Sequence, residues 1–492
     1  MKTIIVWYRS DLRLHDHPAL WSAAEASDFV VPVFIFNDRL LTGKHAGSNR
    51  NRFLLECLSD LRTSLQAIGG DIVLRSGNPA EVLIQLAQQV GAEAIYYTAD
   101  YTPYAIARDK QVKQKLTDEK IQFRSFSGRL IVDQLQKLAT KTGTTHKIFT
   151  PFWKNWMAVP RRAVADVPSK LALPPSLDRG TLPKLATITH AADLSPEVML
   201  GGETAGRKRM DNWLATGVDT YHLHNNQLSS DGTSRLSPYL HFGCISAREL
   251  ESRLTDSDGA RAYNRQLCWR DFYHYIFFNF PNNADQEFQE RYRDYDWGSD
   301  KKLLQAWQQG KTGYPVVDAA MRQLNTEGWM HNRGRLIVGS FLTKDLGLDW
   351  RLGETYFMRM LLDGDESNNN GNWQWIASVG VDPAPVFRRL YNPTLQQEKF
   401  DSSDGYVHKF VPELQKVPKK YLTEPWNMPE TVQQDSGCRI GRDYPNRIVD
   451  HAAARLAALD KYRTASSLYQ DSVANSQASP KTSHVKLETT RK

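Results

Sequence analysis

The sequence predicts an α/β domain with a parallel, doubly wound sheet, joined by a long linker to an all-helical domain. In the first third of the chain, short apolar runs alternate with amphipathic stretches, the order expected of parallel strands with helices on both faces. Prolines then gather in an irregular stretch, and from Gly202 onward the helical period dominates. With 492 residues, the chain is long enough for about two to four domains.

The N-terminal domain is predicted over residues 1–135. Five apolar runs there have the length of buried strands, and three amphipathic stretches have the helical period. Pro79 stands at a helix start, where proline is tolerated. No GxGxxG motif follows the first strand, which argues against a dinucleotide site of the Rossmann type. The predicted strands are residues 3–7, 30–36, 71–74, 94–97 and 121–126, and the predicted helices are residues 52–67, 80–89 and 104–119.

The remainder divides into a linker over residues 136–200, a helical domain over 201–463 and a tail over 464–492. The linker contains five prolines between residues 159 and 189, which favours an irregular connection. The tail is rich in Ser, Thr, Gln and Lys. A segment with so little apolar content cannot bury enough surface to pack, so the tail is predicted to be disordered.

Composition and charge are those of an ordinary soluble protein, with 41% hydrophobic and 24% charged residues. The net charge of +7 (62 − 55) permits a polyanionic partner without requiring one. Four cysteines lie far apart and form no CxxC pair, which excludes a disulfide scaffold, argues against a structural zinc site and fits the cytoplasm. The N-terminal apolar run has only five residues, so neither a signal peptide nor a membrane span is predicted, and no metal is expected.

Tryptophan is concentrated in one region. Seven of the 13 Trp residues fall between residues 269 and 375. Core packing accounts for any single one, because aromatic side chains bury large areas. A cluster of this density favours a ring-shaped cofactor, a stacked base or redox chemistry, and composition does not choose among the three.

Two segments of the helical domain combine polar groups in ways that suit ligands. In residues 232–240, small hydroxyl residues precede a predicted helix start, where hydroxyls and backbone N–H groups can bind an anion; a plain N-cap is the alternative. Gln266, Trp269, Arg270 and Tyr273 have the spacing of one helix face. Flat aromatic rings beside an arginine and an amide are used to stack bases and hold phosphates, although core packing is the alternative.

The most informative segment is DGDESNNNGNWQW, residues 363–375. Three acids and four asparagines lie between apolar runs, which is unusual for a surface loop. A calcium loop needs Gly at its sixth position and Glu at its twelfth, and these are Asn368 and Gln374. The Gly310-Lys311-Thr312 triplet is no phosphate-binding loop, because the glycine required five residues earlier is Gln305.

Taken together, the motifs GTSRLSPYL, WRDFY, KTGYPVVDAAMRQL, GWMHNR, DWR and DGD…NNGNWQW resemble the DNA photolyase/cryptochrome family. The similarity is greatest to class I cyclobutane pyrimidine dimer photolyases (deoxyribodipyrimidine photo-lyases), and the opening WYRSDLRLHDHPAL fits as well. The resemblance covers residues 4 to about 424. It implies an α/β antenna domain, a helical FAD-binding domain and light-driven repair of a dimer that is flipped out of damaged DNA.

The resemblance also implies a set of flavin-binding residues. The phosphates and ribityl chain would be held by Tyr221, Thr233, Ser234, Arg235, Leu236 and Ser237. Tyr263 would lie beside the flavin, and Asp363, followed by Gly364, would pair with Arg335 across the ring system. Asp365 would face the adenine or ribityl side. Asn369 would lie near flavin N5, where its amide could hydrogen-bond a reduced flavin.

The same resemblance implies two further sets of residues, one for electron transfer and one for DNA binding. Trp373, Trp350 and Trp297 would form an electron relay from the flavin to the surface. The damaged DNA would contact Gln266, Trp269, Arg270, Tyr273, Asn332 and Gln396, with Trp269 stacked on the lesion. The protein is expected to act as a monomer.

Three positions depart from the class I pattern. Gln266 stands where these enzymes usually carry Glu, Leu336 replaces a Met, and Asn225 stands where many have an Arg that contacts DNA. Gln at the position of Gln266 is usual in 6-4 photolyases and animal cryptochromes. Those proteins carry two His in the pocket, whereas this chain has Asn332 and Leu336, which disfavours 6-4 repair.

The sequence is compatible with more than one second chromophore and with more than one function. Residues 101–109 lack the Asn-Glu pair of relatives that bind methenyltetrahydrofolate, so a deazaflavin, a flavin or an empty second site are all compatible. Repair of cyclobutane dimers is the favoured function. The alternatives are a cryptochrome-like blue-light sensor without repair, and a flavoprotein that binds DNA without turnover.

Overall fold

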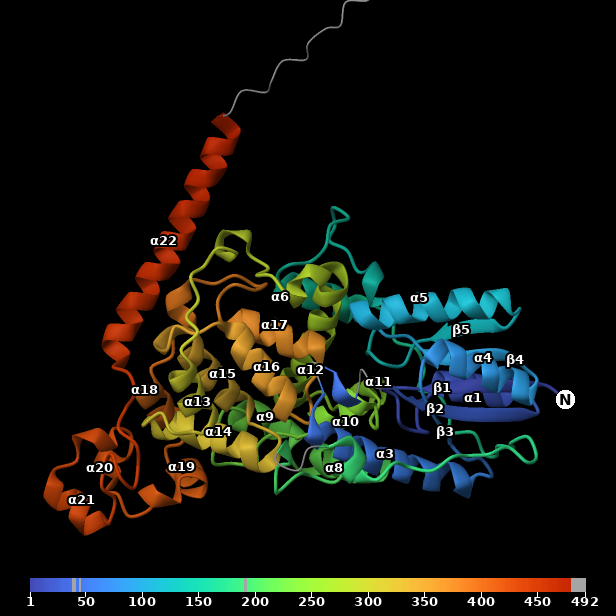
Figure 1. Ribbon diagram of the computed structural model, residues 1–492, viewed down its shortest axis with the longest axis horizontal. Coiled ribbons are helices and arrows are strands. Elements are labelled where there is room, and N and C mark those ends of the chain that lie inside the picture. Colours follow the sequence, from blue (N-terminus) through green and yellow to red (C-terminus); the bar gives the residue numbers. More distant parts are fainter. Residues whose placement is uncertain (38–40, 44–45, 190–192, 479–492) are drawn as a thin grey trace, which may run out of the picture.

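The computed structural model describes residues 1–37, 41–43, 46–189 and 193–478, which form an α/β lobe and a helical lobe (Figure 1). Five strands make one parallel sheet in the order β3-β2-β1-β4-β5. The predicted fold class is confirmed. The strands are β1 (Thr3–Tyr8), β2 (Phe29–Phe36), β3 (Val73–Ser76), β4 (Ala92–Thr98) and β5 (Gln122–Phe126).

Helices cover both faces of this sheet. Along β1, Ile4 and Val6 pack with α1 (Pro18–Ala26) and α3 (Ser48–Ala67), whereas Ile5 and Trp7 pack with α4 (Pro79–Val90) and α5 (Pro103–Asp118). Alternate residues of a strand point to opposite faces, so a strand that is covered on both sides is apolar throughout. This is why β1 and β2 were recognisable as apolar runs in the sequence, whereas β5 lies at the edge of the sheet and is largely exposed, which corrects the expectation of a buried strand there.

The predicted elements of this lobe differ from the structure mainly at their ends. The strand predicted over residues 71–74 is instead Val73–Ser76, because the Asp71 side chain holds the loop before it by accepting from Arg62 Nε (3.0 Å) and Ile72 N (2.7 Å). The sequence analysis missed α1. This helix has only nine residues and is capped by His17, whose Nδ1 accepts from Leu20 N at 3.0 Å.

The first half of the predicted linker is part of the core, which corrects the expectation of an irregular connection over residues 136–200. It contains α6 (Phe149–Ala158), which buries Phe149, Phe152 and Trp156. The Trp156 Nε1 donates to Asp271 Oδ2 of the helical lobe at 3.0 Å. Beyond α6, the only helix in the described part of the linker is α7 (Leu185–Ile188).

Fifteen named α-helices build the helical lobe in the described part of the chain, with short 3-10 or π turns between them. A second apolar core, around the buried Trp307, Trp350 and Trp373, holds most of them together. The helices are α8 (Glu203–Thr216), α9 (Tyr221–His224), α10 (Ser237–Phe242), α11 (Ala247–Ser252), α12 (Asp258–Asn279), α13 (Lys301–Gln308), α14 (Pro315–Glu327), α15 (Asn332–Ser340), α16 (Trp350–Met360), α17 (Glu366–Ile376), α18 (Pro393–Phe400), α19 (Gly405–Phe410), α20 (Lys419–Leu422), α21 (Glu430–Ser436) and α22 (His451–Ala478).

The tail prediction is wrong for residues 464–478, which continue α22, and residues 479–492 lie outside the described residues. The helix packs through Ala458 and Tyr462 and then projects from the lobe (Figure 1). Only a few residues of this segment contact the lobe: Ala465 packs against the second apolar core, and Tyr469 Oη donates to Glu290 Oε2 at 3.2 Å. A helix can nevertheless form there, because Ala, Leu, Gln and Arg favour the helical backbone even when they are exposed.

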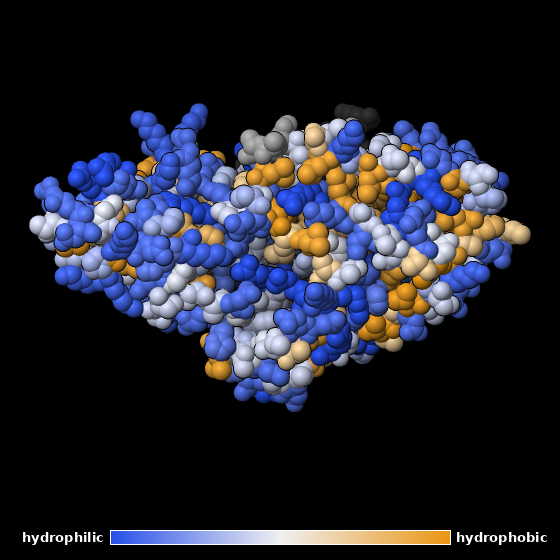
Figure 2. Space-filling model, turned by 90° about the horizontal axis from the view of Figure 1, so that it is seen from below, coloured by the Kyte–Doolittle hydropathy of each residue, from blue (hydrophilic) through white to orange (hydrophobic). Residues whose placement is uncertain are grey.

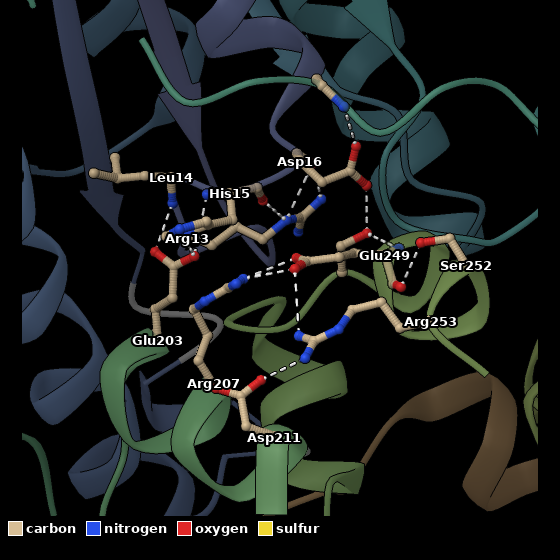
Figure 3. Close-up of polar contacts among 12 residues, drawn as sticks. Arg13, Leu14, His15, Asp16, Glu203, Arg207, Asp211, Glu249, Ser252 and Arg253 are labelled. Carbon is tan, nitrogen blue, oxygen red and sulfur yellow. Dashed lines mark hydrogen bonds and ion pairs between the residues drawn. The ribbon is translucent and has the colours of Figure 1, made fainter. Parts of the chain in front are cut away.

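A polar network joins the two lobes (Figure 3). Glu203, at the start of α8, accepts from the backbone N of Leu14 (2.7 Å) and of His15 (3.1 Å) in the loop after β1. Arg13 in the same loop donates to Gly243 O at 2.9 Å. The network fixes the α/β lobe against α8 and α11, and it continues through Asp16, Arg207, Asp211, Glu249, Ser252 and Arg253.

The surface seen from below is mostly hydrophilic, and its hydrophobic residues lie chiefly on the half nearer the α/β lobe (Figure 2). Among the described residues, no helix combines the length and apolar character that crossing a membrane requires.

Candidate functional site

A cavity of about 440 Å³ opens in the helical lobe, within the size range of small-molecule sites. Its walls come from the segment before α10 and from α12, α15, α16 and α17. Most of the predicted site residues line it, although they are scattered over more than 150 residues of sequence. These are Tyr221, Thr233, Ser234, Arg235, Leu236, Ser237, Tyr263, Gln266, Trp269, Arg270, Tyr273, Asn332, Arg335, Asp363, Asp365, Asn369 and Trp373.

Four predicted residues lie outside the cavity lining. Gly364 is next to the Arg50 guanidinium, and its lack of a side chain allows that approach. Gln396 is half-buried on α18. Trp350 is fully buried behind the cavity wall, and Trp297 is half-buried farther out.

One wall is the polar and aromatic face of α12. Ser257 begins this helix by accepting from Ala260 N at 3.0 Å, and the helix then runs for 22 residues. Trp269 packs against Phe149 of α6, while Gln266 is exposed at the cavity wall. The predicted face therefore lines the cavity, with Gln266 exposed at one end and Tyr273 buried in the apolar core at the other.

The segment before α10 contributes hydroxyl groups. The N-cap of α10 is Leu236, without a side-chain hydrogen bond, so Thr233 and Ser234 do not serve as the N-cap. Ser234 Oγ instead accepts from Tyr263 Oη (2.9 Å) and from Leu236 N (3.2 Å). Arg235 has a left-handed backbone (φ 51°), and its guanidinium contacts Glu327 Oε2 at 3.2 Å.

The opposite wall carries the acidic segment. Arg335 Nη2 donates to Asp363 Oδ2 at 2.9 Å and to Oδ1 at 3.2 Å, so the predicted pair exists. Asp365 begins α17 by accepting from Asn368 N at 2.9 Å. Asn369 lies one turn into this helix, and its Nδ2 donates to Glu354 O at 2.9 Å. The side chains of Asp363, Asp365 and Asn369 therefore face one cavity because a helix starts between them.

Asp365 is the centre of a buried electrostatic cluster. Its Oδ2 contacts Arg129 Nη2 of the α/β lobe at 3.0 Å, and its Oδ1 is 3.5 Å from His274 Nε2. Burial alone would raise the pKa of Asp365, but His274, His241 and Arg129 hold it well below its usual range. Burial lowers the pKa of His274 to about 4, so at neutral pH the permanent positive charges near Asp365 are those of Arg129 and Arg270.

The cavity lining fits a large ligand with flat rings and charged parts. Indole and phenol rings offer stacking surfaces, and hydroxyls and arginines offer donors. The Nδ1 atom of the half-buried His241 makes no hydrogen bond within 3.5 Å in the described part of the chain, and it lies 3.8 Å from Asp365 Oδ2. A buried polar atom without a partner is unfavourable unless a ligand or water satisfies it. The described residues contain no group of three or more side chains suited to a metal ion.

The sequence analysis missed His241 and Trp375 as cavity residues. Trp375 is the last residue of the recognised motif NNGNWQW, and His241 directly follows the recognised motif GTSRLSPYL, so a signal was present. Trp375 lines the cavity, and the Arg389 guanidinium lies 3.9 Å from its ring centroid.

The three tryptophans predicted as a relay run from the cavity outward. Trp373 lines the cavity and packs against Gly353 of α16, one turn beyond Trp350. Trp350 and Trp297 are joined through one residue: their Nε1 atoms donate to Glu287 Oε1 at 3.2 and 3.0 Å. The three tryptophans are thus linked through α16 and Glu287, and the use of this link for electron transfer stays a prediction.

The predicted antenna region lies where the strand order of the sheet reverses, between β1 and β4. Arg9 at the end of β1 donates to Asp109 of α5 at 2.7 and 3.0 Å, and its guanidinium is 4.8 Å from the Trp7 ring centroid. These contacts do not discriminate among the candidate second chromophores.

Comparison with known proteins identifies both lobes. Residues 4–172 match the family described as DNA photolyase, and residues 263–464 match the FAD binding domain of DNA photolyase. A deoxyribodipyrimidine photo-lyase from Streptomyces griseus is 37% identical over 458 residues, which cover 92% of this chain and 98% of the relative. A cryptochrome DASH from Gloeobacter violaceus is 34% identical over 473 residues, with coverage of 91% and 93%.

Solved structures give the same result. A bacterial class III photolyase from Agrobacterium tumefaciens has a TM-score of 0.89 at 35% identity, covering 95% of this chain and 98% of that one. An archaeal photolyase from Sulfolobus tokodaii, solved with two FAD molecules, has a TM-score of 0.81 at 29% identity, with coverage of 94% and 100%.

Proposed function

The chain belongs to the DNA photolyase family, and on this premise we propose that it repairs cyclobutane pyrimidine dimers in damaged DNA under blue light. One observation carries the proposal: the face formed by Gln266, Trp269 and Arg270 opens onto the same cavity as Asp363 and Asn369. A face suited to a damaged base and a wall suited to a flavin thus share one space.

The cavity residues fit FAD. Asp363, fixed by Arg335, would bind the ring system, and the hydroxyls of Thr233 and Ser234 would bind the phosphates. The Nδ1 atom of His241, which lies 3.8 Å from Asp365 Oδ2, would gain a closer polar partner. When bound, FAD supplies the redox chemistry, donating an electron to the dimer in its excited reduced form and taking one from Trp373 in its excited oxidised form.

The protein's part in lesion binding is recognition and exclusion of water. A dimer is already partly unstacked, so flipping it out of the duplex costs less than flipping an intact pair. Trp269 would stack on the flipped bases, and Arg270 and Asn332 would contact the DNA at the cavity entrance. Gln266 would hydrogen-bond the dimer as a neutral donor, more weakly than the Glu usual at this position.

The relay tryptophans would supply the electron that reduces the oxidised flavin. Trp373 would give up an electron first, and Trp350 and then Trp297 would refill it in turn. The family and the four buried free cysteines support a protein that works in the reducing cytoplasm, and we propose that it acts there as a monomer.

Repair can be tested with purified protein, reduced flavin and ultraviolet-irradiated oligo(dT). Blue light should remove the dimers, which chromatography of the digested DNA measures, while a dark sample should keep them. Loss of dimers in the dark sample would mean that the assay itself destroys them. Intact dimers after illumination of a fully reduced sample would contradict the proposal.

A second candidate is a blue-light sensor without repair activity. The similarity to a cryptochrome DASH and the Gln266 departure both favour it. In that case the reduced protein leaves dimers intact, although light still reduces its oxidised flavin.

A further inference from the structure

Glu287 lies between two tryptophans of the relay. It follows the 3-10 turn η4 (Pro281–Ala284), and its side chain is almost fully buried, with 3% exposure. A single oxygen, Oε1, accepts from the Nε1 atoms of Trp297 (3.0 Å) and Trp350 (3.2 Å). These two residues come from different parts of the lobe, 53 positions apart, and this carboxylate is the polar contact they share.

The other oxygen of Glu287 is held by Arg351. Arg351 Nη2 donates to Oε2 at 2.9 Å, and the guanidinium lies 4.6 Å from the Trp350 ring centroid. Asp349 also binds this guanidinium, at 3.1 Å. Two carboxylates thus share one cation, and −2 + 1 leaves one negative charge beside the two indoles.

Other groups packed around Glu287 do not cancel that charge. Arg293 Nε donates to the backbone oxygen of Glu287 at 3.4 Å and also pairs with Glu290 at 3.3 Å. The nearby Tyr462 hydroxyl donates to Ala377 O, and its pKa is raised by burial first and by neighbouring groups that include Glu287.

Two neutral indole N–H groups do not require a carboxylate. A glutamine amide oxygen would accept the same two hydrogen bonds without the cost of burying a charge. The charge of Glu287 pairs with Arg351, and the net negative charge left by Glu287 and Asp349 would in addition stabilise an indole that has lost an electron, as a relay tryptophan does.

We infer that Glu287 is the base that accepts the indole proton of Trp297 after Trp297 has been oxidised. The inference rests on the proposed electron relay. Trp297 first gives one electron to oxidised Trp350 and becomes a radical cation. Its N–H bond then breaks, the bonding electron pair stays on Nε1, and the proton moves to Glu287 Oε1. The products are a neutral Trp297 radical and a neutral carboxylic acid.

The proton transfer would slow charge recombination, the return of the electron to Trp297. A neutral Trp297 radical lacks the positive charge that draws the electron back, so return transfer needs the proton to come back as well. Both Nε1 atoms lie within hydrogen-bond distance of Oε1, and Trp297 is the proton donor because it ends the path on the solvent side. Trp350 is fully buried and would keep its proton.

The hydrogen bonds are tested first in cofactor-free protein labelled with ¹⁵N-tryptophan. The indole resonances of Trp297 and Trp350, assigned with Trp297→Phe and Trp350→Phe, should both shift in Glu287→Gln. The matched control is Glu290→Gln, an exposed glutamate three positions away, which should shift neither. Unchanged Trp297 and Trp350 resonances in Glu287→Gln would overturn the inference without touching the repair proposal.

The proton step is tested by flash spectroscopy of the oxidised holoenzyme. Wild type and Glu290→Gln should form the deprotonated tryptophan radical at the same rate. Glu287→Gln should form it at least about tenfold more slowly, with the protonated radical persisting, because the amide cannot take the proton. Equal rates in all three proteins would overturn the inference. Absence of any tryptophan radical in wild type would overturn the relay and the inference together. The proposed repair function would still be tested separately, by dimer loss with chemically pre-reduced enzyme.

A wild-type measurement covers the case in which Glu287→Gln does not fold. Light-induced difference infrared spectra should show the C=O stretch of a newly protonated carboxylic acid, which shifts with ¹³C-glutamate labelling and disappears in Trp297→Phe. A radical that forms without this band would show that the proton goes elsewhere.

Discussion

The rings of Trp269 and Phe149 lie face to face, with centroids 3.7 Å apart and planes inclined by 4°. Trp269 belongs to α12 and lines the cavity, whereas Phe149 begins α6. The orientation of the proposed lesion-stacking surface is therefore set by a residue from the segment between the two lobes.

Replacing Phe149 by Leu should weaken binding of dimer-containing DNA by about two- to tenfold, because an aromatic pair contributes about 0.5–1.5 kcal/mol beyond its buried area. Titration of dimer-containing and intact duplexes measures the effect. The control is Phe152→Leu, a buried residue on the same helix that contacts Phe272 and Tyr275. Equal losses in the two variants would indicate general destabilisation of α6.

Asp363→Asn should lower the affinity for FAD by at least about tenfold. It leaves the half-buried Arg335 without its charged partner, and a hydrogen bond to a charged group contributes about 1.5–3 kcal/mol. Titration of cofactor-free protein with FAD tests this, and Asp296→Asn, at an exposed ion pair with Lys461, should bind FAD normally. Unchanged FAD affinity in Asp363→Asn would remove Asp363 from the cofactor site.

Gln266→Glu should raise the affinity for dimer-containing DNA by about fivefold, because a charge-assisted hydrogen bond is about 1 kcal/mol stronger than a neutral one. Intact duplex should bind as before. Asn225→Arg is the comparison variant. One more phosphate contact should strengthen binding to both duplexes and should steepen the slope of log K against log salt concentration by about one. A loss of dimer preference in Gln266→Glu would mean that position 266 does not face the lesion.

Trp373→Phe should block photoreduction of the oxidised flavin and leave repair by chemically pre-reduced enzyme nearly intact, because Phe preserves packing but is a poor site for an electron vacancy. Absorbance during illumination measures the first property, and dimer loss the second. Trp426→Phe, which packs on Tyr314 away from the cavity, is the control. Wild-type photoreduction in Trp373→Phe would point to a bypass, and Trp307, 6.2 Å from Trp373, is the first residue to replace next.

His331 should make the protein less stable in mild acid. Burial first, and then Arg235, Arg333 and Arg335, lower its pKa from 6.5 to about 4. As the pH falls below about 6.5, the unfolded chain binds a proton that the folded protein does not. The free energy of unfolding therefore decreases by about 1.4 kcal/mol per pH unit until the folded pKa is reached.

His331→Asn tests this assignment. Asparagine can replace the Nδ1 atom that accepts from Arg333 N at 3.1 Å, while removing the titrating group. Denaturant unfolding measures the free energy of unfolding at pH 7 and at pH 5. The decrease between the two pH values should be about 2 kcal/mol smaller in the variant than in wild type. The same loss in both proteins would assign the acid sensitivity to other groups.

Sequence alone determined the elements whose pattern is local. The central strands β1 and β2 are apolar throughout because both faces are covered, and the face of α12 follows from helical spacing. The motifs in residues 232–240 and 363–375 also supplied many of the residues that line the cavity. Such patterns depend only on the backbone period and on neighbouring side chains, so they can be read without knowing the fold.

Tertiary structure decided which distant residues meet. Spacing could not show that Phe149, in an expected linker, stacks on Trp269, or that Arg129 of the α/β lobe pairs with Asp365. Nor could it show that Trp297 and Trp350 share Glu287, a residue with no motif around it. These contacts depend on how helices pack across the whole lobe, and packing is set by the summed shape of many side chains, which no local period contains.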